Sequence, residues 1–241
     1  MTIIPAIDIL DGMCVRLTKG DYSTGKVYFE DPLAVALRFN EYGITRIHVV
    51  DLNGADSDHI VNREILKRIC RETTMTVDFG GGIKSERDID SALECGASMV
   101  TVGSLAAASP ETVHEWIGRY GADKIILGAD SRNGKIAIKG WRENSGLDIF
   151  DFISDYRSHG ISRVICTDIN RDGTLEGPAI DLYKEILLRF PGLKLTASGG
   201  VSSIDDLKKL TEAGLDSAIV GKAYYEGRIT IEELKAINDN R

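Results

Sequence analysis

The chain has 241 residues, of which 43% are hydrophobic and 27% are charged, and its formal net charge at pH 7 is −8. Such a length can bury the core of one α/β barrel or of two small domains. The acidic balance argues against a nucleic-acid-binding or membrane-surface protein, because both need a basic face. The chain starts directly with a strand-like segment and its four cysteines are scattered, so we expect no signal peptide, no membrane span, and a cytoplasmic protein with reduced thiols.

Eight short apolar runs alternate with longer helix-like segments along the chain. The runs are nearly continuous in Val, Ile, Leu, Ala and Thr, which is typical of a parallel sheet that is covered on both faces. They lie at 2–8, 45–51, 74–79, 98–103, 124–130, 162–168, 193–198 and 216–221. Eight β/α units in a chain of this length predict a (β/α)₈ TIM barrel.

Several of the helices between these runs have recognisable start signals. A proline near the first helical turn marks three of them, at Pro32, Pro110 and Pro178. The serine–aspartate pairs Ser85/Asp88 and Ser203/Asp206 resemble capping boxes in which aspartate replaces the usual Glu or Gln.

The two halves of the chain resemble each other. GITRIHVVDLN at 43–53 aligns without gaps on GISRVICTDIN at 160–170, and DFGGGIKSERDIDSALECGASMVTVGS at 78–104 aligns on TASGGVSSIDDLKKLTEAGLDSAIVGK at 196–222. Asp8 and Asp130 extend the correspondence. Because these offsets are close to half the chain, we predict a single barrel domain over 1–241, built from half-barrels at about 1–121 and 122–241.

Glycines end four of the predicted strands, and active sites of such barrels lie at the C-terminal ends of the strands. The positions are Gly81 with Gly82, Gly103 with Ser104, Gly199 with Gly200, and Gly221 with Lys222. Glycine allows close backbone approach, and a following helix N-terminus offers free N–H groups to an anion. The pattern predicts two phosphate cradles on opposite sides of the mouth, although each glycine pair could also serve only a tight turn. An elongated ligand with a phosphate at each end would fit both cradles.

Carboxylates form the second group of candidate residues. Asp8 ends the first strand and Asp130 the fifth, so they should face each other across the mouth, an arrangement that suits general acid/base catalysis. Asp51 and Asp168 end the second and sixth strands and could be structural, bonding nearby backbone. We predict no metal and no cofactor, because the carboxylates are spread over different strands without a histidine partner and no P-loop or nicotinamide motif is present.

Two further residues have two interpretations each. His48, within the second strand, could point into the mouth and contact a substrate or pack inside the barrel, whereas the other three histidines should be solvated. Trp141, in the segment KGWRENSG after the fifth strand, could stack on a flat substrate ring or anchor its own loop.

Several segments together resemble the histidine-biosynthesis isomerase that acts on phosphoribosylformimino-aminoimidazole carboxamide ribotide. They are IPAIDILDGMCVRLTKGDY, VVDLNGA, FGGGIKS, LGAD with KGWRENSG, and TDINRDGTLEGP. The resemblance covers essentially the whole chain. The sister family, the cyclase subunit of imidazole glycerol phosphate synthase, shares the two-half barrel and both aspartates. Here, however, Ala6 precedes Ile7-Asp8, and the loop with Arg16, Gly20 and Tyr22 has the isomerase form.

The resemblance implies an Amadori rearrangement of an aminoaldose to an aminoketose, on a small bisphosphorylated substrate. We expect a monomer. By analogy Asp130 would be the general acid that opens the ribose ring, and Asp8 the base that takes the C2′ proton. Thr167 would hydrogen-bond the substrate, and Asp168 beside it is a further predicted substrate-binding residue. The loops after the first and fifth strands would close over it as lids. They carry Arg16, Lys19 and Trp141.

Three alternatives stay open at this point. The chain could be the cyclase subunit, which would need a glutaminase partner. It could also isomerise phosphoribosyl anthranilate in addition to the histidine-pathway substrate. A non-catalytic phosphosugar-binding protein is the third alternative, which the presence of both Asp8 and Asp130 disfavours.

Overall fold

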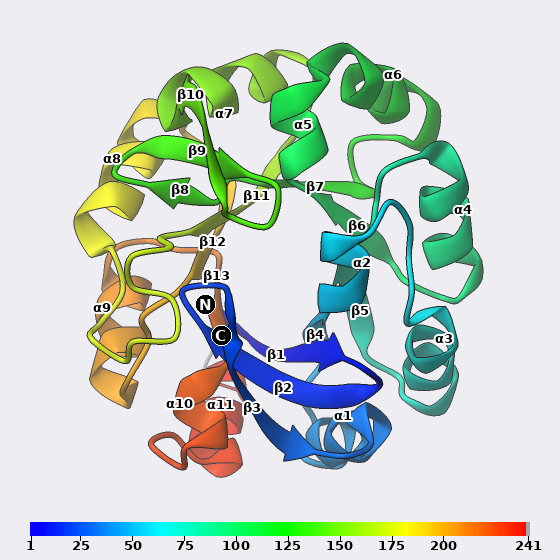
Figure 1. Cartoon of the computed structure of the whole chain (residues 1–241). Coiled ribbons are helices and arrows are strands. Elements are labelled where there is room, and N and C mark those ends of the chain that lie inside the picture. The colour runs from blue at the N-terminus through cyan, green and yellow to red at the C-terminus, as the bar shows by residue number, and fades with distance from the viewer. Residues whose placement is uncertain (240–241) are drawn as a thin grey trace.

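A computed structural model describes residues 1–239, which form a closed barrel of parallel strands with helices around it (Figure 1). The eight barrel strands are β1 (Thr2–Leu10), β4 (Arg46–Asp51), β5 (Thr76–Gly80), β6 (Met99–Val102), β7 (Ile125–Gly128), β11 (Arg163–Thr167), β12 (Lys194–Ser198) and β13 (Ser217–Val220). They pair in chain order, and β13 pairs with β1 to close the ring. The predicted (β/α)₈ barrel is therefore confirmed.

Helices cover the outside of the barrel and follow its strands. The longer ones are α1 (Pro32–Glu41), α3 (Arg63–Glu72), α4 (Glu86–Glu94), α6 (Pro110–Tyr120), α7 (Ile149–Ser158), α8 (Ile180–Arg189), α9 (Ile204–Glu212) and α11 (Ile231–Asp239). Three short helices, α2 (Leu52–Asp56), α5 (Ser104–Ala108) and α10 (Lys222–Tyr225), begin directly after β4, β6 and β13. None of the helices within residues 1–239 is long and apolar enough to cross a membrane.

Most of the predicted helix starts are found where expected. Ser85 caps α4 by accepting from the Asp88 N–H, and Ser203 caps α9 in the same way. The start predicted at Pro178 is two residues early, since α8 begins at Ile180. The Gly177 N–H donates to the Gly200 carbonyl at 2.9 Å, which holds this segment against the loop after β12 before the helix begins.

Two antiparallel segments extend the C-terminal ends of the barrel, a hairpin that continues the barrel sheet and a separate small sheet (Figure 1). After β1 the chain forms a hairpin of β2 (Met13–Thr18) and β3 (Asp21–Phe29). After β7 it forms a three-stranded sheet of β8 (Ser131–Arg132), β9 (Lys135–Ile138) and β10 (Glu143–Asp148). These are the two segments that the sequence marks as lid candidates, and both form antiparallel strands rather than open loops.

The apolar core has two parts because strand residues alternate between the two faces of the sheet. The larger part lies between the sheet and the helices and includes Ile7, Phe39 and Tyr156. The smaller part fills the barrel and contains Ile4, Ala6, Met99, Ile126, Ile165 and Ile219. On β1 the inward positions run Ile4, Ala6, Asp8, so the apolar filling ends and a carboxylate begins where the barrel opens.

Candidate active site

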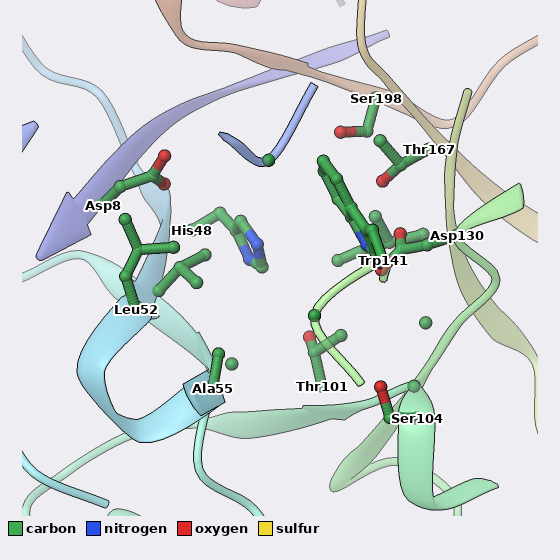
Figure 2. Close-up of a pocket in the computed structure, with 18 of the residues that line it drawn as sticks. Asp8, His48, Leu52, Ala55, Thr101, Ser104, Asp130, Trp141, Thr167 and Ser198 are labelled. Atoms are coloured by element: carbon green, nitrogen blue, oxygen red, sulfur yellow. Dashed lines mark hydrogen bonds between the residues drawn. The ribbon is translucent and has the colours of Figure 1, made fainter. Parts of the chain in front are cut away.

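A pocket of about 220 Å³ opens at the C-terminal ends of the strands, and both predicted catalytic aspartates line it. Figure 2 shows Asp8 and Asp130 on opposite sides of this pocket. The predicted site residues that line it are Asp8, Arg16, His48, Gly81, Gly82, Gly103, Ser104, Asp130, Trp141 and Thr167. Strands and loops from both halves of the chain thus meet in one cavity.

The remaining predicted phosphate-binding residues line a smaller cavity of about 20 Å³ beside the first. Gly199, Gly200, Gly221 and Lys222 all line it. The Lys222 Nζ donates to Thr18 Oγ1 at 2.9 Å and to the Gly173 carbonyl at 2.8 Å. In this conformation the lysine ammonium is therefore held by the hairpin after β1 and the loop after β11.

The matched glycines also have a packing role that explains their identity. A Cβ on Gly199 would lie 2.9 Å from the Asp168 carbonyl oxygen, and one on Gly81 would overlap the corresponding carbonyl of Asp51. Both glycines have positive φ, 91° and 85°. The tight-turn interpretation therefore holds for these two positions, and it is compatible with an additional role in binding an anion.

Asp8 lies at the end of the inward row of β1 and is paired with a cation. The Arg16 Nη1 lies 2.8 Å from Asp8 Oδ2, and both side chains are largely buried. Burial raises the pKa of Asp8, while the Arg16 guanidinium and His48 act in the opposite direction. A carboxylate that is desolvated yet kept next to a fixed positive charge can be ionised and still be more basic than an ordinary aspartate.

Asp130 follows the end of β7 and accepts hydrogen bonds instead of an ion pair. The Trp141 indole Nε1–H donates to Asp130 Oδ2 at 2.9 Å, and Thr167 also hydrogen-bonds this carboxyl. Burial raises the pKa of Asp130, against the effect of these two hydrogen bonds. Trp141 thus anchors its loop on the carboxyl group, as one of its two interpretations predicts.

Asp172 is a third carboxyl in the cavity that sequence reasoning missed. It lines both pockets, in the loop after β11. Burial raises its pKa to about 6, opposed by Arg16 and Lys222 but reinforced by the charges of Asp8 and Asp130. The signal in the sequence was a second aspartate in the segment TDINRDGTLEGP, four residues beyond the strand-end aspartate.

Two predicted site residues do not line either pocket. Lys19 is exposed at the tip of the β2–β3 hairpin, with its backbone N–H bonded to the Asp172 carbonyl at 3.0 Å. Asp168 accepts from the Asn170 N–H at 3.0 Å and lies 3.6 Å from the Arg171 Nε, so it organises its own loop. A role for either residue in binding substrate stays a prediction.

One group of side chains within residues 1–239 has the spacing of metal ligands, and it lies outside the barrel. His114 on α6 stacks on His159 with ring centroids 3.5 Å apart, and the His114 Nε2 lies 2.9 Å from Asp155 Oδ2. His114 is mostly covered rather than solvated as expected, because the two rings pack on each other beside Tyr156. These residues lie on outer helices and take no part in the cavity at the barrel mouth.

A comparison with protein families matches residues 2–230 to the model of the histidine biosynthesis protein family. The chain belongs to this family. A protein of Parabacteroides distasonis is 56% identical over 232 residues, covering 96% of this chain and 97% of that protein. Proteins of Bacteroides thetaiotaomicron (54%) and Flavobacterium psychrophilum (52%) match over 97% and 98% of this chain and 98% of their own length. All three are named 1-(5-phosphoribosyl)-5-((5-phosphoribosylamino)methylideneamino)imidazole-4-carboxamide isomerase.

These matches confirm the resemblance found in the sequence and identify the chain as an isomerase of histidine biosynthesis. The relatives named here are isomerases and none is a cyclase subunit, so the cyclase alternative is not supported. A family whose named members are enzymes also disfavours the pure binding protein.

Proposed function

We propose that the chain catalyses the Amadori rearrangement of phosphoribosylformimino-aminoimidazole carboxamide ribotide, which converts its phosphoribosyl aminoaldose arm to the phosphoribulosyl aminoketose. The observation that carries this proposal is the placement of Asp8 and Asp130 on opposite sides of one pocket at the barrel mouth (Figure 2). The elongated substrate would lie between them, with one phosphate toward Gly81, Gly82, Gly103 and Ser104 and the other toward Gly199, Gly200, Gly221 and Lys222.

The reaction needs an acid first and a base second. The acid, Asp130, protonates the ribose ring oxygen, and the C1′–O bond breaks as the nitrogen lone pair forms the C1′=N bond of a Schiff base. The base, Asp8, removes the C2′ proton, and the electron pair of that C–H bond moves to give an enolamine. Protonation at C1′ and loss of the C2′ hydroxyl proton then give the ketose.

The surroundings of Asp8 support its role as the base. Its ion pair with Arg16 favours the ionised form, and its burial, which raises the pKa, strengthens it as a proton acceptor. Arg16 also lines the smaller cavity, where it would meet a substrate phosphate. One guanidinium would then serve both the base and the anion.

Asp172 is a second candidate for the acid. Its pKa of about 6 leaves a fraction of this carboxyl protonated near neutral pH, so it could also supply the first proton. Burial raises the pKa of Asp130 as well, but two hydrogen-bond donors act in the opposite direction there. If Asp172 were the acid, Asp130 would hold the substrate and the lid tryptophan in place. The two assignments make different predictions for substitutions.

Turnover of the aminoaldose by Asp8→Asn, Asp130→Asn and Asp172→Asn tests the assignments. We expect Asp8→Asn and Asp130→Asn to abolish turnover, with affinity for the substrate kept within about tenfold, or about 1.4 kcal/mol. An Asp130→Asn variant with near-wild-type turnover would remove Asp130 as the acid. Loss of turnover in Asp172→Asn together with retained activity in Asp130→Asn would transfer that role to Asp172.

Phosphoribosyl anthranilate, assayed in parallel with the wild-type protein, tests the breadth of the activity. Turnover of the aminoaldose alone would make the enzyme monospecific, and turnover of both would make it bispecific. Turnover of neither substrate, with both still bound, would contradict the proposed reaction.

A further inference from the structure

A row of three charged or polar side chains lies inside the barrel beneath the cavity. Arg46 and His48 project from β4, and Asp78 projects from the neighbouring strand β5. The Arg46 Nε and Nη2 lie 3.3 and 3.2 Å from Asp78 Oδ2, and the His48 Nδ1 hydrogen-bonds Asp78 Oδ1. Asp78 has no exposed surface, so its carboxylate depends entirely on these two partners.

The symmetry of the chain shows that the barrel does not require this row. In the gapless alignment of the two halves, Arg46, His48 and Asp78 correspond to Arg163, Ile165 and Thr196. In the second half Ile165 belongs to the apolar filling of the barrel, and Thr196 Oγ1 shares a 2.7 Å hydrogen bond with Ser217 Oγ. The second half thus keeps the arginine but fills the positions of His48 and Asp78 with an isoleucine and a threonine. A fully buried carboxylate is costly, so its presence in one half alone points to a role beyond packing.

The position of His48 indicates what that role is. Its side chain lines the cavity, and Figure 2 shows it between Asp8 and Asp130. Because Nδ1 faces the buried carboxylate, Nδ1 carries the proton and Nε2 is the ring nitrogen available to a ligand. In the neutral imidazole, Nε2 then presents a lone pair, which accepts a hydrogen bond from a hydroxyl group.

We propose that Asp78, fixed by Arg46, is a positioning residue that holds His48 in its Nδ1-protonated tautomer, so that Nε2 accepts a hydrogen bond from a hydroxyl group of the bound sugar between Asp8 and Asp130. This inference rests on the proposed function, which places a sugar phosphate in that space. This hydrogen bond matters at the step in which the C2′ hydroxyl loses its proton to form the ketone. A His48 Nε2 lone pair oriented toward that hydroxyl assists the proton transfer. Arg46 neutralises Asp78 from the opposite side and keeps its carboxylate in place.

Two variants and a matched control distinguish a positioning role of Asp78 in catalysis from a role in protein stability alone. Asp78→Asn keeps the shape but removes the charge that selects the tautomer. The double variant His48→Ile/Asp78→Thr copies the residues of the second half, and so offers a second fold-compatible test. Thr196→Val removes the polar group at the symmetry-related position and is the control. We expect both first-half variants to lower kcat on the order of 10²-fold with KM within about threefold, and the control to leave kcat unchanged.

The tautomer of His48 gives a readout that does not depend on turnover. The ¹⁵N shifts of its imidazole, assigned by their loss in His48→Gln, should show a protonated Nδ1 in the wild-type protein and a changed tautomer population in Asp78→Asn. A protonated Nε2 with a bare Nδ1 in the neutral wild-type ring would overturn the proposal. So would first-half variants that melt earlier but keep wild-type kcat. Wild-type turnover of the aminoaldose is measured first, and its absence would contradict the proposed function while the NMR result still tests the tautomer.

Discussion

The guanidinium of Arg16 lies 2.8 Å from the Asp8 carboxylate and directly over the backbone of Gly221. Arg16 belongs to the hairpin strand β2, Asp8 to the first barrel strand, and Gly221 follows the last one. The predicted lid, the proposed base and the second predicted phosphate cradle therefore meet at one side chain. The absence of a side chain on Gly221 is what gives the guanidinium its place.

Gly221→Ala tests this arrangement. A Cβ on Gly221 would overlap the Arg16 guanidinium, so the end of the arginine side chain would have to shift from its place beside Asp8. We expect kcat/KM to fall at least about tenfold, or about 1.4 kcal/mol, with a much smaller change in the free energy of unfolding. Steady-state kinetics and thermal melts of the same preparations measure both effects.

Gly118→Ala is the matched control, because a Cβ on Gly118 in α6 would meet no other atom within 4 Å. It should leave kcat/KM unchanged and stabilise the protein by up to about 1 kcal/mol, since alanine is the better helix former. Wild-type kinetics in Gly221→Ala would show that the position of Arg16 over Gly221 does not matter for activity.

Trp141 is expected to report closure of the lids. It donates to Asp130, and a Cβ on Gly20 of the β2–β3 hairpin would lie 2.6 Å from its ring, so it touches both lid segments. Trp141→Phe keeps much of the ring but removes the N–H. We expect kcat/KM to fall about tenfold, the effect of losing one hydrogen bond to a carboxylate.

Intrinsic fluorescence distinguishes lid closure from a general loss of structure. The chain has two tryptophans, and Trp116 is buried in α6 with 3% of its surface exposed. The fluorescence change on substrate binding should therefore persist in Trp116→Phe and vanish in Trp141→Phe. A signal that survives in Trp141→Phe would place the ligand-sensitive fluorophore elsewhere.

Much of the site could be predicted from the sequence because a barrel brings the ends of all its strands to one mouth. The strand count and the half-chain offset were enough to predict that Asp8 and Asp130 lie across from each other. The order of β strands and the capping serines Ser85 and Ser203 follow from equally local rules. Such features do not depend on how a particular loop folds.

Asp172 and Asp78 could not be placed by the same reasoning. The position of Asp172 depends on a loop that is held by a hydrogen bond from the Lys19 N–H, 153 residues earlier in the chain, and no local pattern encodes that contact. Asp78 lies in an apolar strand, and only the register between β4 and β5 reveals that His48 is its partner. Asp168 shows the converse, since a strand-end aspartate can turn away from the mouth when its own loop offers donors.

The raised pKa of Asp172 predicts how stability depends on pH. A carboxyl whose pKa is 3.8 unfolded and about 6 folded binds its proton more tightly in the folded state, so its contribution is most favourable below pH 4 and is lost as pH rises through 6. This difference between the two pKa values corresponds to a change of at most about 3 kcal/mol in the free energy of unfolding. Relative to wild type, Asp172→Asn should become progressively more stable between pH 4 and pH 7. Urea unfolding of both proteins at several pH values measures this, and parallel pH profiles would contradict the pKa.

The last prediction compares the two strand-end aspartates that are related by the half-chain repeat, Asp51 and Asp168. Asp51 is fully buried and accepts four hydrogen bonds, from the Gly54, Val61 and Asn62 backbone N–H groups and from the Asn62 side chain. Asp168 is only partly buried and accepts one backbone bond at 3.0 Å beside its contact with Arg171.

Replacing Asp51 by Asn puts an NH₂ group where an oxygen accepts from buried N–H groups, which leaves donors unsatisfied. We expect this to cost about 3 kcal/mol or more of unfolding free energy, whereas Asp168→Asn should cost about 1 kcal/mol or less. Urea midpoints of the two variants give the comparison directly. Equal losses would mean that the repeat has kept one structural role at both positions, and that the denser hydrogen bonding around Asp51 adds nothing to stability.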